Sequence, residues 1–358
     1  MFHQYFEQSM KNTKRLLIIS GIIICSLPFN VTGQTLKNSG DSTYSSLNNK
    51  QIDRELRDEL DSTFSWFRKN PPSTDGSNFL SRWKKTALLD KCGSQISNDT
   101  WNLYRSHWIN NPAEAANMEG SNPILYYLRG AVDKSVSEIR AAKVKRGAII
   151  WKLYNMGYII KTKDACFGID LNQPGSEKLV DLLDFVIASH IHSDHHNIAL
   201  LNAMVMAGKP VYSPFYTKGT LISSTREFTF GELNVRFTMN KQADVPVIVS
   251  QINCGPAANN YTIYHIADSR SLADLNPDRH VNLFILHIEN AIDVFEAVAR
   301  VKPDITVYDH AMELGHAVDK WRWSYEFTCN KIKDLPHASS WVLTWGEKLE
   351  VGVERKKH

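Results

Sequence analysis

Four side chains of types that commonly bind metal ions stand within six consecutive residues. The segment His190-Ile191-His192-Ser193-Asp194-His195 directly follows a short apolar run that predicts a buried strand. Because alternate residues of an extended chain point to the same side, His190 and His192 can bind one cation while Asp194 and His195 turn toward a second. Imidazole and carboxylate ligands together suit zinc or a similar divalent ion. The segment therefore predicts a metal site at a strand end.

The HxHxDH spacing of these ligands resembles the motif of the metallo-β-lactamase superfamily. The resemblance implies an α/β (α+β) fold, an αββα sandwich of two mixed sheets packed face to face with helices outside, over residues 145–358. It also implies metal-assisted hydrolysis, with Asp194 as the catalytic residue that orients a water molecule and accepts its proton. Asp170 would support the metal loop from behind, and Asp268 would bridge two ions. The implied metal ligands are His190, His192, Asp194, His195, Asp268 and His310.

The elements predicted around the motif fit such a sandwich. Two β-rich segments, 148–154 and 158–162, are broken at Asn155-Met156-Gly157, which predicts a hairpin. A third short strand, 166–170, ends in Asp170. Further strands are expected at 185–189, 209–212, 261–268 and 305–310, with helices at 198–206 and 291–301.

One ligand expected from the resemblance is missing, because the loop expected before the Asp268 strand, 235–260, contains no histidine. Side-chain oxygen atoms are acceptable ligands for divalent ions and could substitute for it. His265 is another candidate, but strand alternation points it away from Asp268, so it is interpreted as a core histidine or one that supports a ligand. A single-ion site, or a weakly bound second ion, would follow. The possible oxygen substitutes are Asp244, Asn240 and Asn259.

Two polar residues that follow His310 are candidates for substrate contact. A short turn could bring Glu313 or His316 over the site, although a solvated helix start explains them equally well. His196, next to the motif, is interpreted as a bystander. The remaining histidines without ligand-like neighbours are interpreted as structural or surface residues: His107, His280, His287 and His337.

The amino terminus predicts export to the periplasm or the outside of the cell. Basic residues at 11–15 precede the apolar stretch 16–29, and small residues follow at 31–33, so a signal peptide 1–33 with cleavage before Gln34 is expected. The apolar stretch contains Pro28 and is short for a bilayer, which disfavours a retained anchor. No stable membrane span is expected after its removal. Cleavage would lower the formal charge from +3 to +1, so no nucleic-acid partner is expected.

A different kind of sequence lies between the signal peptide and the sandwich. Residues 34–49 are rich in Ser, Asn and Thr and predict a flexible linker. Apolar residues at helical spacing then predict helices near 52–67, 79–89, 100–108 and 124–142, within a helical accessory or cap domain, 50–144. Its aromatic residues are expected in the core, with a substrate entrance or a dimer contact as the alternative. They are Trp101, Tyr104, Trp108, Tyr126 and Tyr127.

These observations together predict an exported metal-dependent hydrolase. It would use metal-activated water on an ester, lactone, amide or phosphodiester bond of a small-molecule substrate. The expected cofactor is Zn²⁺, one ion or two, with Mn²⁺ or iron as alternatives. Two other functions stay open: a binding protein with an incomplete metal site, and an iron-dependent oxidoreductase of the same fold. Homo-oligomers stay open, and disulfides among the four cysteines beyond residue 33 are optional.

Overall fold

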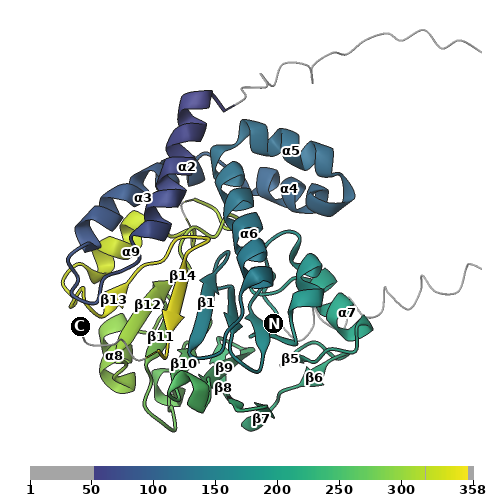
Figure 1. The fold of residues 1–358 in the computed structure, drawn as a ribbon, viewed down its shortest axis with the longest axis vertical. Coiled ribbons are helices and arrows are strands. Elements are labelled where there is room, and N and C mark those ends of the chain that lie inside the picture. Colours follow the sequence, from purple (N-terminus) through teal and green to yellow (C-terminus); the bar gives the residue numbers. More distant parts are fainter. Residues whose placement is uncertain (1–51, 319, 354–358) are drawn as a thin grey trace, which may run out of the picture. The chain divides into compact units, whose positions relative to one another are not determined.

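Two seven-stranded sheets form the centre of the protein in the computed structural model, which describes residues 52–318 and 320–353 (Figure 1). The predicted signal peptide, its cleavage site and the linker lie outside the described residues. Among the helices of the described residues, none is both long enough and apolar enough to cross a bilayer.

The first sheet contains the predicted hairpin and the strand that leads into the histidine motif. Its strands β14, β1, β2 and β3 pair antiparallel, and β3 to β6 pair parallel. The hairpin is confirmed, and its turn uses Asn155 at a φ of 49°, a left-handed conformation that asparagine tolerates. Across the sheet the strands are β14 (Lys348–Val351), β1 (Ala148–Lys152), β2 (Tyr158–Lys161), β3 (Cys166–Ile169), β4 (Phe185–Ile187), β5 (Val211–Ser213) and β6 (Thr220–Leu221).

The second sheet contains the strands that lead to Asp268 and His310. Strands β10 to β13 pair parallel, and β7 to β10 pair antiparallel. The segment 235–260 was expected as a loop, and this prediction is wrong, because most of it forms the long β8–β9 hairpin. Across the sheet the strands are β13 (Ser340–Trp341), β12 (Ile305–Asp309), β11 (Leu283–His287), β10 (Thr262–His265), β9 (Val245–Asn253), β8 (Leu233–Gln242) and β7 (Arg226–Phe230).

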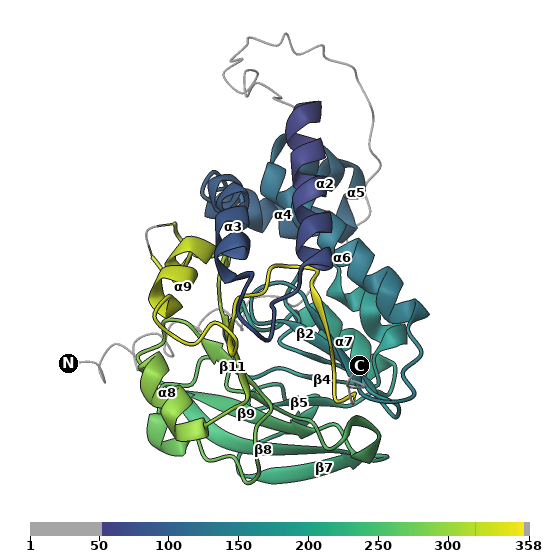
Figure 2. The ribbon, with the colours of Figure 1, turned by 60° about the vertical axis from the view of Figure 1, so that its left-hand side comes forward.

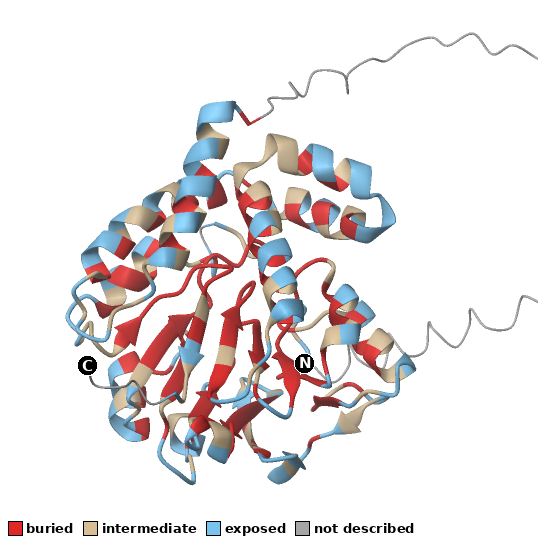
Figure 3. Ribbon diagram, in the orientation of Figure 1, coloured by how far each residue is buried: buried red, intermediate tan, exposed pale blue. Residues whose placement is uncertain are grey.

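Side-chain alternation along the strands builds a core on each face of a sheet, which is why most strand residues are buried (Figure 3). In β11, Leu283 and Ile285 join the core between the two sheets, whereas Phe284 and Leu286 join the core on the outer face. Helices cover both outer faces, so the predicted αββα layering is confirmed. Helix α7 (Ile198–Met206) and the 3-10 helix η1 (Ser176–Leu182) pack on the first sheet, and α8 (Val294–Val301) and α9 (Tyr325–Ile332) on the second.

A group of helices precedes the sandwich in the chain (Figure 2). Its helix α2 is amphipathic and buries Leu60, Thr63 and Phe67, while Asp53 caps its first turn by accepting a hydrogen bond from the Leu56 amide (2.7 Å). Four of these helices were predicted and α5 was not. The helices are α2 (Arg54–Lys69), α3 (Phe79–Gly93), α4 (Asn98–Asn110), α5 (Pro112–Ser121) and α6 (Pro123–Ala141).

These helices share one hydrophobic cluster with the outer face of the second sheet. Leu60 and Leu89 belong to the same cluster as Phe284 and Tyr308. The buried Arg82 of α3 reinforces the contact by an ion pair of 2.8 Å with Glu347. Four of the five predicted core aromatics are buried and Tyr126 is half-buried, which confirms core packing for those four. The domain boundary near residue 144 stays a prediction.

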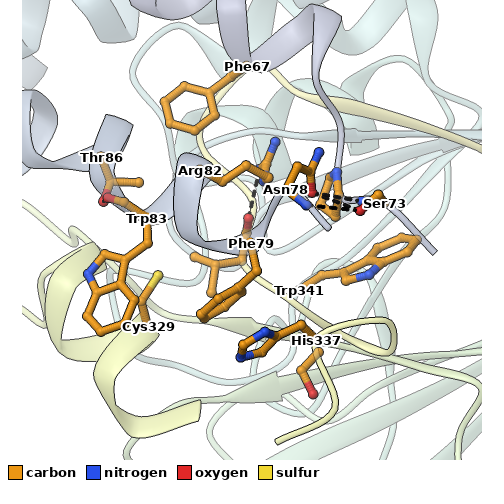
Figure 4. A pocket seen from close by; sticks show the side chains of 13 residues that line it. Phe67, Ser73, Asn78, Phe79, Arg82, Trp83, Thr86, Cys329, His337 and Trp341 are labelled. Carbon is orange, nitrogen blue, oxygen red and sulfur yellow. Dashed lines mark hydrogen bonds between the residues drawn. The ribbon is translucent and has the colours of Figure 1, made fainter. Parts of the chain in front are cut away.

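A small cavity lies where α3 meets α9 and β13 (Figure 4). Its volume of about 20 Å³ holds roughly one water molecule. Phe79 stacks on His337 at a ring-centroid distance of 3.8 Å beside it. Within the described residues, all four cysteines are buried free thiols: Cys92, Cys166, Cys254 and Cys329.

Candidate metal centre

Strand ends from both sheets bring the candidate ligands together. In the first sheet β3 runs into Asp170, and the parallel strand β4 runs into the segment His190–His195. In the second sheet the parallel strands β10, β11 and β12 lead to Asp268, His287 and His310. Because the carboxyl ends of parallel strands lie at one edge of a sheet, these residues converge. Three candidate metal-binding groups result, each with its ligand atoms within 4.8 Å of one another: His190, His195 and Asp268; Asp194, His195 and His310; Asp268, His287 and His310.

Three buried ligand atoms at this point form no hydrogen bond of normal geometry with the described residues: His190 Nε2, His195 Nε2 and Asp268 Oδ1. His195 Nε2 lies 2.9 Å from Asp268 Oδ1, and His190 Nε2 lies 3.8 Å from Asp268 Oδ2. A buried polar atom without a partner costs about 1–3 kcal/mol. Three such atoms facing one another fit a bound cation, which would satisfy all of them.

Hydrogen bonds behind the cluster set the tautomers of two histidines. Asp170 accepts from the Ser189 hydroxyl (2.7 Å), so the Ser189 oxygen is free to accept from His190 Nδ1 (2.9 Å). Asp170 also accepts from His195 Nδ1 (2.8 Å). Both imidazoles therefore carry a proton on Nδ1 and direct Nε2 to the cluster, where this nitrogen can bind a cation when it is not protonated. Asp170 lies where the sequence predicted a support for the metal loop.

The second group combines the motif with the end of β12. His310 Nε2 lies 3.1 Å and His195 Nε2 lies 3.4 Å from Asp194 Oδ2. His192 is half-buried, its ring centre is 4.7 Å from that of His190, and it lines the same cavity as His310. His192 is not part of the three candidate groups. The structure thus brings five of the six predicted ligands into these groups and places the sixth beside them.

Two exits from the second sheet use left-handed backbone. His310 has a φ of 69°, and Ala267, just before Asp268, has a φ of 47°. Such conformations cost of order 1–3 kcal/mol for residues other than glycine and concentrate at functional sites. The amide of His310 donates to Asp309 Oδ1 (2.8 Å), which holds this turn.

His287 was interpreted as a structural or surface residue, and this interpretation is wrong. It is buried, lines the cavity and stacks on His310 at a centroid distance of 4.1 Å. A signal existed in the sequence, because the apolar run that His287 ends lies between the two strands that lead to Asp268 and His310. Its Nδ1 accepts the Glu289 amide (2.9 Å), and burial and His310 hold its pKa well below the ordinary value. The neutral ring therefore carries its proton on Nε2 and acts as a donor there, although distance alone would allow it to be a ligand.

A comparison of two variants tests this distinction. We expect His287→Ala to keep the metal stoichiometry of the natural protein, whereas His310→Ala loses bound metal, because only His310 has a ring nitrogen free to bind the ion. Metal content measured by mass spectrometry after gel filtration gives the result. A loss of metal in His287→Ala equal to that in His310→Ala would show that His287 is a ligand.

The proposed substitutes for the missing histidine lie outside the cluster. Asp244 is exposed, and the side chain of Asn240 bonds both backbone groups of Ser271 instead (3.0 and 3.1 Å). Asn259 donates to the Gly352 carbonyl (3.0 Å) and lines a separate cavity. Gln242, at the end of β8, reaches the site and donates to Asp268 Oδ2 (2.8 Å). Gln242 was not predicted, because a single glutamine does not form a recognisable spacing of metal ligands.

His265 lies within the sandwich, apart from the ligand groups. It is fully buried, and its Nε2 lies 3.1 Å from the carbonyl oxygen of Met156. Its ring packs edge-on against Tyr158. Strand alternation turns it away from the ligands, as expected for a core histidine.

The segment after His310 folds back over the cluster. His316 stacks beside His310 with 5.5 Å between ring centres, and its Nε2 lies 3.8 Å from Asp194 Oδ2. Glu313 is buried, lies 3.5 Å from His316 Nδ1 and accepts from the Tyr154 hydroxyl (2.8 Å). Of the two substrate-contact candidates, His316 therefore reaches the cavity and Glu313 supports it.

Hydrogen bonds between residues 93–98 and residues 315–322 hold this segment in place. The buried Arg322 donates to the carbonyl oxygens of Gly93 (3.0 Å) and Ile96 (2.7 Å). Gly93 is the last residue of helix α3, and Ile96 lies just beyond it. Asn98, at the start of α4, donates to the carbonyl oxygen of Gly315 (2.7 Å). The N-terminal helices thus fix the position of His316.

A cavity of about 590 Å³ opens over the cluster. Asp194, Asp268 and His310 line it on the side of the candidate ligands, and Arg270 and Trp321 line it elsewhere. This volume is in the range of small-molecule sites. The cluster is therefore accessible to a small substrate.

Burial and charge act in opposite directions on the ligand groups. Burial opposes the charged form of Asp268, yet the charge of the nearby His195 outweighs it and holds the pKa of Asp268 well below its usual range. Burial also opposes protonation of His195, but Asp268, Asp194 and Asp170 raise its pKa well above the ordinary value. For His190, burial and the nearby His195 lower the pKa to about 3. In the absence of a metal ion, a proton on His195 thus balances the carboxylates.

Metal affinity is expected to fall on acidification. The pKa values of His195 and His310 are raised in the metal-free protein, for His310 because hydrogen bonding to Asp194 and the charge of Asp268 outweigh burial. A binding metal must displace these protons, so affinity should drop about tenfold per pH unit for each proton displaced. His190 should contribute no proton above about pH 5, given its lowered pKa. Competition with a coloured chelator between about pH 6 and 8 measures the slope, and a flat profile would contradict this charge balance.

Comparisons with known proteins yield matches among solved structures. No protein-family model matches the chain, and no curated protein matches it. The metallo-β-lactamase fold protein YhfI from Bacillus subtilis is 15% identical, with a TM-score of 0.44, over 57% of this chain and 100% of that chain. Igni18, a metallo hydrolase from Ignicoccus hospitalis, is 16% identical with a TM-score of 0.45, over 56% of this chain and 97% of its own. The chain resembles metallo-β-lactamase fold proteins.

A third similar structure has a different chemistry. CmlA, a diiron β-hydroxylase from Streptomyces venezuelae, is 12% identical with a TM-score of 0.40, over 57% of this chain and 54% of that chain. The solved structures to which this chain is similar thus include a metallo hydrolase and a diiron β-hydroxylase. At such identities the activity of this chain has to be argued from its own residues.

Proposed function

We propose that this protein is a metal-dependent hydrolase of small molecules. The observation that carries the proposal is the convergence of His190 Nε2, His195 Nε2 and Asp268 Oδ1, three buried atoms that form no hydrogen bond of normal geometry with the described residues. Asp170 orients both imidazoles, that of His195 directly and that of His190 through the Ser189 hydroxyl. Such support is typical of metal-binding histidines. A cavity large enough for a small substrate lies beside them.

The residues of this chain divide the work between binding and proton transfer. A divalent ion such as Zn²⁺ would lower the pKa of a water molecule to about 7 and polarise the bond under attack. Asp194 lines the cavity and would orient that water and accept its proton. The Asn155 side chain donates to the Asp194 carbonyl oxygen (2.9 Å) and fixes the loop that carries this carboxylate.

The ligand set supports one tightly held ion and leaves room for a second. His195, Asp268 and His310 each belong to two of the candidate groups. An imidazole nitrogen can bind one ion, whereas the two oxygen atoms of Asp268 could serve two ions. The bond cleaved is an ester, lactone, amide or phosphodiester within this proposal. Export to the periplasm or the cell exterior, predicted from residues 1–33, is part of the proposal as well.

Metal analysis combined with an activity panel tests the proposal. Protein purified without tags or chelators is expected to contain zinc or manganese and to hydrolyse at least one chromogenic ester, lactone, amide or phosphodiester. Chelation should abolish that activity, and zinc should restore it. Iron with no hydrolysis would favour an oxidoreductase, and protein that binds no metal in excess zinc would refute the proposal and favour a binding protein.

A further inference from the structure

One arginine lies at the cavity beside the metal cluster, and the inference drawn from it rests on the proposed function. The acidic side chains that line the cavity are Asp194, Asp268 and Glu289. One divalent ion would neutralise the two aspartates, and Lys331 pairs with Glu289. Arg270 is the one Lys or Arg side chain among the described residues that line the cavity. Arg270 is exposed, so a ligand in the cavity can reach its guanidinium.

The guanidinium of Arg270 is held in place without being neutralised. Its Nε donates to Asn290 Oδ1 (2.9 Å), and the buried Asn290 in turn donates to the carbonyl oxygen of Ser269 (2.8 Å). Arg270 forms no ion pair with another side chain within the described residues, 52–318 and 320–353. Anchoring through Nε leaves the two terminal nitrogens as a fork, a geometry that matches carboxylate and phosphate oxygens.

An indole supplies a second contact surface at the cavity. Trp321 lines it and is 63% exposed, which is unusual for so large an apolar side chain. Trp321 packs edge-on against His316. The next residue, Arg322, is buried and donates hydrogen bonds to backbone carbonyl oxygens. Trp323 also lines the cavity and stacks on Phe327. The indoles are therefore supported from behind while one face stays open to a ligand.

We propose that the substrate of this site is a small organic anion, whose carboxylate or phosphate is bound by Arg270 while its apolar body lies against Trp321. Arg270 follows Asp268 by two residues, so the anion site adjoins the metal cluster. A substrate with its charged group here would present a neighbouring bond to the ion. A neutral substrate would gain no ion pair with the guanidinium.

Binding to the metal-loaded protein tests the proposal with matched probes. The probes are 3-phenylpropionate, phenyl phosphate and the neutral alcohol 3-phenylpropan-1-ol, measured by calorimetry. Both anions are expected to bind about tenfold more tightly than the alcohol, the effect of roughly one charge-assisted hydrogen-bonded pair. The tighter of the two anions identifies carboxylate or phosphate as the preferred group.

Variants separate the guanidinium from direct binding to the metal. Arg270→Gln should remove most of the preference for anions, and Arg270→Lys should keep part of it because the charge remains. Arg279→Gln is the control, since Arg279 pairs with Asp278 and lines another cavity. Trp321→Leu should weaken all three probes alike. Unchanged anion binding in Arg270→Gln that contains its full metal would overturn this inference alone, whereas absence of metal from the natural protein would overturn the proposed function.

Discussion

An Asp268→Ala variant is expected to hold less than one equivalent of metal per chain and to lose chelator-sensitive hydrolysis. Asp268 belongs to two of the three candidate metal groups, and its carboxylate faces His190, His195 and His287. Without it, His190 and His287 have no carboxylate of the candidate groups beside them, and His195 keeps only Asp194. A metal present at a thousandfold excess over its Kd stabilises a protein by about 4 kcal/mol, and this gain should vanish in the variant. Metal content and the melting temperature with and without zinc measure both effects.

Two neighbouring residues provide controls for that experiment. Asp244→Ala removes an exposed carboxylate just beyond the end of β8 and should leave metal binding unchanged. Gln242→Ala removes a hydrogen bond to Asp268 and should lower affinity by about 10–100-fold without abolishing it. If Asp268→Ala kept its metal and its zinc-dependent melting temperature, Asp268 would not be a ligand.

Replacing Lys152 by methionine is expected to destabilise the fold by about 3–5 kcal/mol. Lys152 lies in β1 and its Nζ is 2.8 Å from Asp309 Oδ2 in β12, so the pair links the two sheets with both side chains almost fully buried. The Tyr158 hydroxyl also donates to Asp309. Loss of the ammonium would leave a buried carboxylate without a countercharge. Because Asp309 also accepts the amide of His310, metal affinity should fall as well.

Denaturant unfolding of three variants checks this interpretation. Lys348→Met removes a half-exposed lysine that pairs with Glu350, and such surface pairs contribute about 0–1 kcal/mol. The double variant Lys152→Met/Asp309→Asn should recover much of the loss, since no unpaired charge then remains. A Lys152→Met protein as stable as Lys348→Met would show that the buried pair contributes little.

The parts of the site that could be predicted from the sequence share one property. The motif, Asp170, Asp268 and His310 each follow an apolar run of strand length, so their positions at strand ends can be derived from local pattern alone. His287 satisfies the same criterion. It could not be recognised from local pattern, because a single histidine has no ligand spacing and the place of its strand in the sheet is a long-range property. Knowledge that β11 runs parallel between β10 and β12 places it at the cluster.

Long-range features could not be predicted in the same way. The segment that forms the β8–β9 hairpin was expected as a loop. Its apolar run, 245–253, forms strand β9. The pairing of Arg82 with Glu347 joins residues that are 265 positions apart, and no local pattern encodes it. The tautomer of His287 depends on the amide of Glu289, which only the folded backbone positions.

The anchoring of the His316 segment by Arg322 and Asn98 has a practical consequence for recombinant work. A minimal fragment that starts at the sandwich would lack Gly93, Ile96 and Asn98, so the Arg322 guanidinium would lose three acceptors and keep only the carbonyl oxygens of Leu314 and His316. Expression boundaries should therefore be set upstream of α3. Without these residues the segment that carries His316 would lose its attachment, and the cavity over the candidate ligands would change shape.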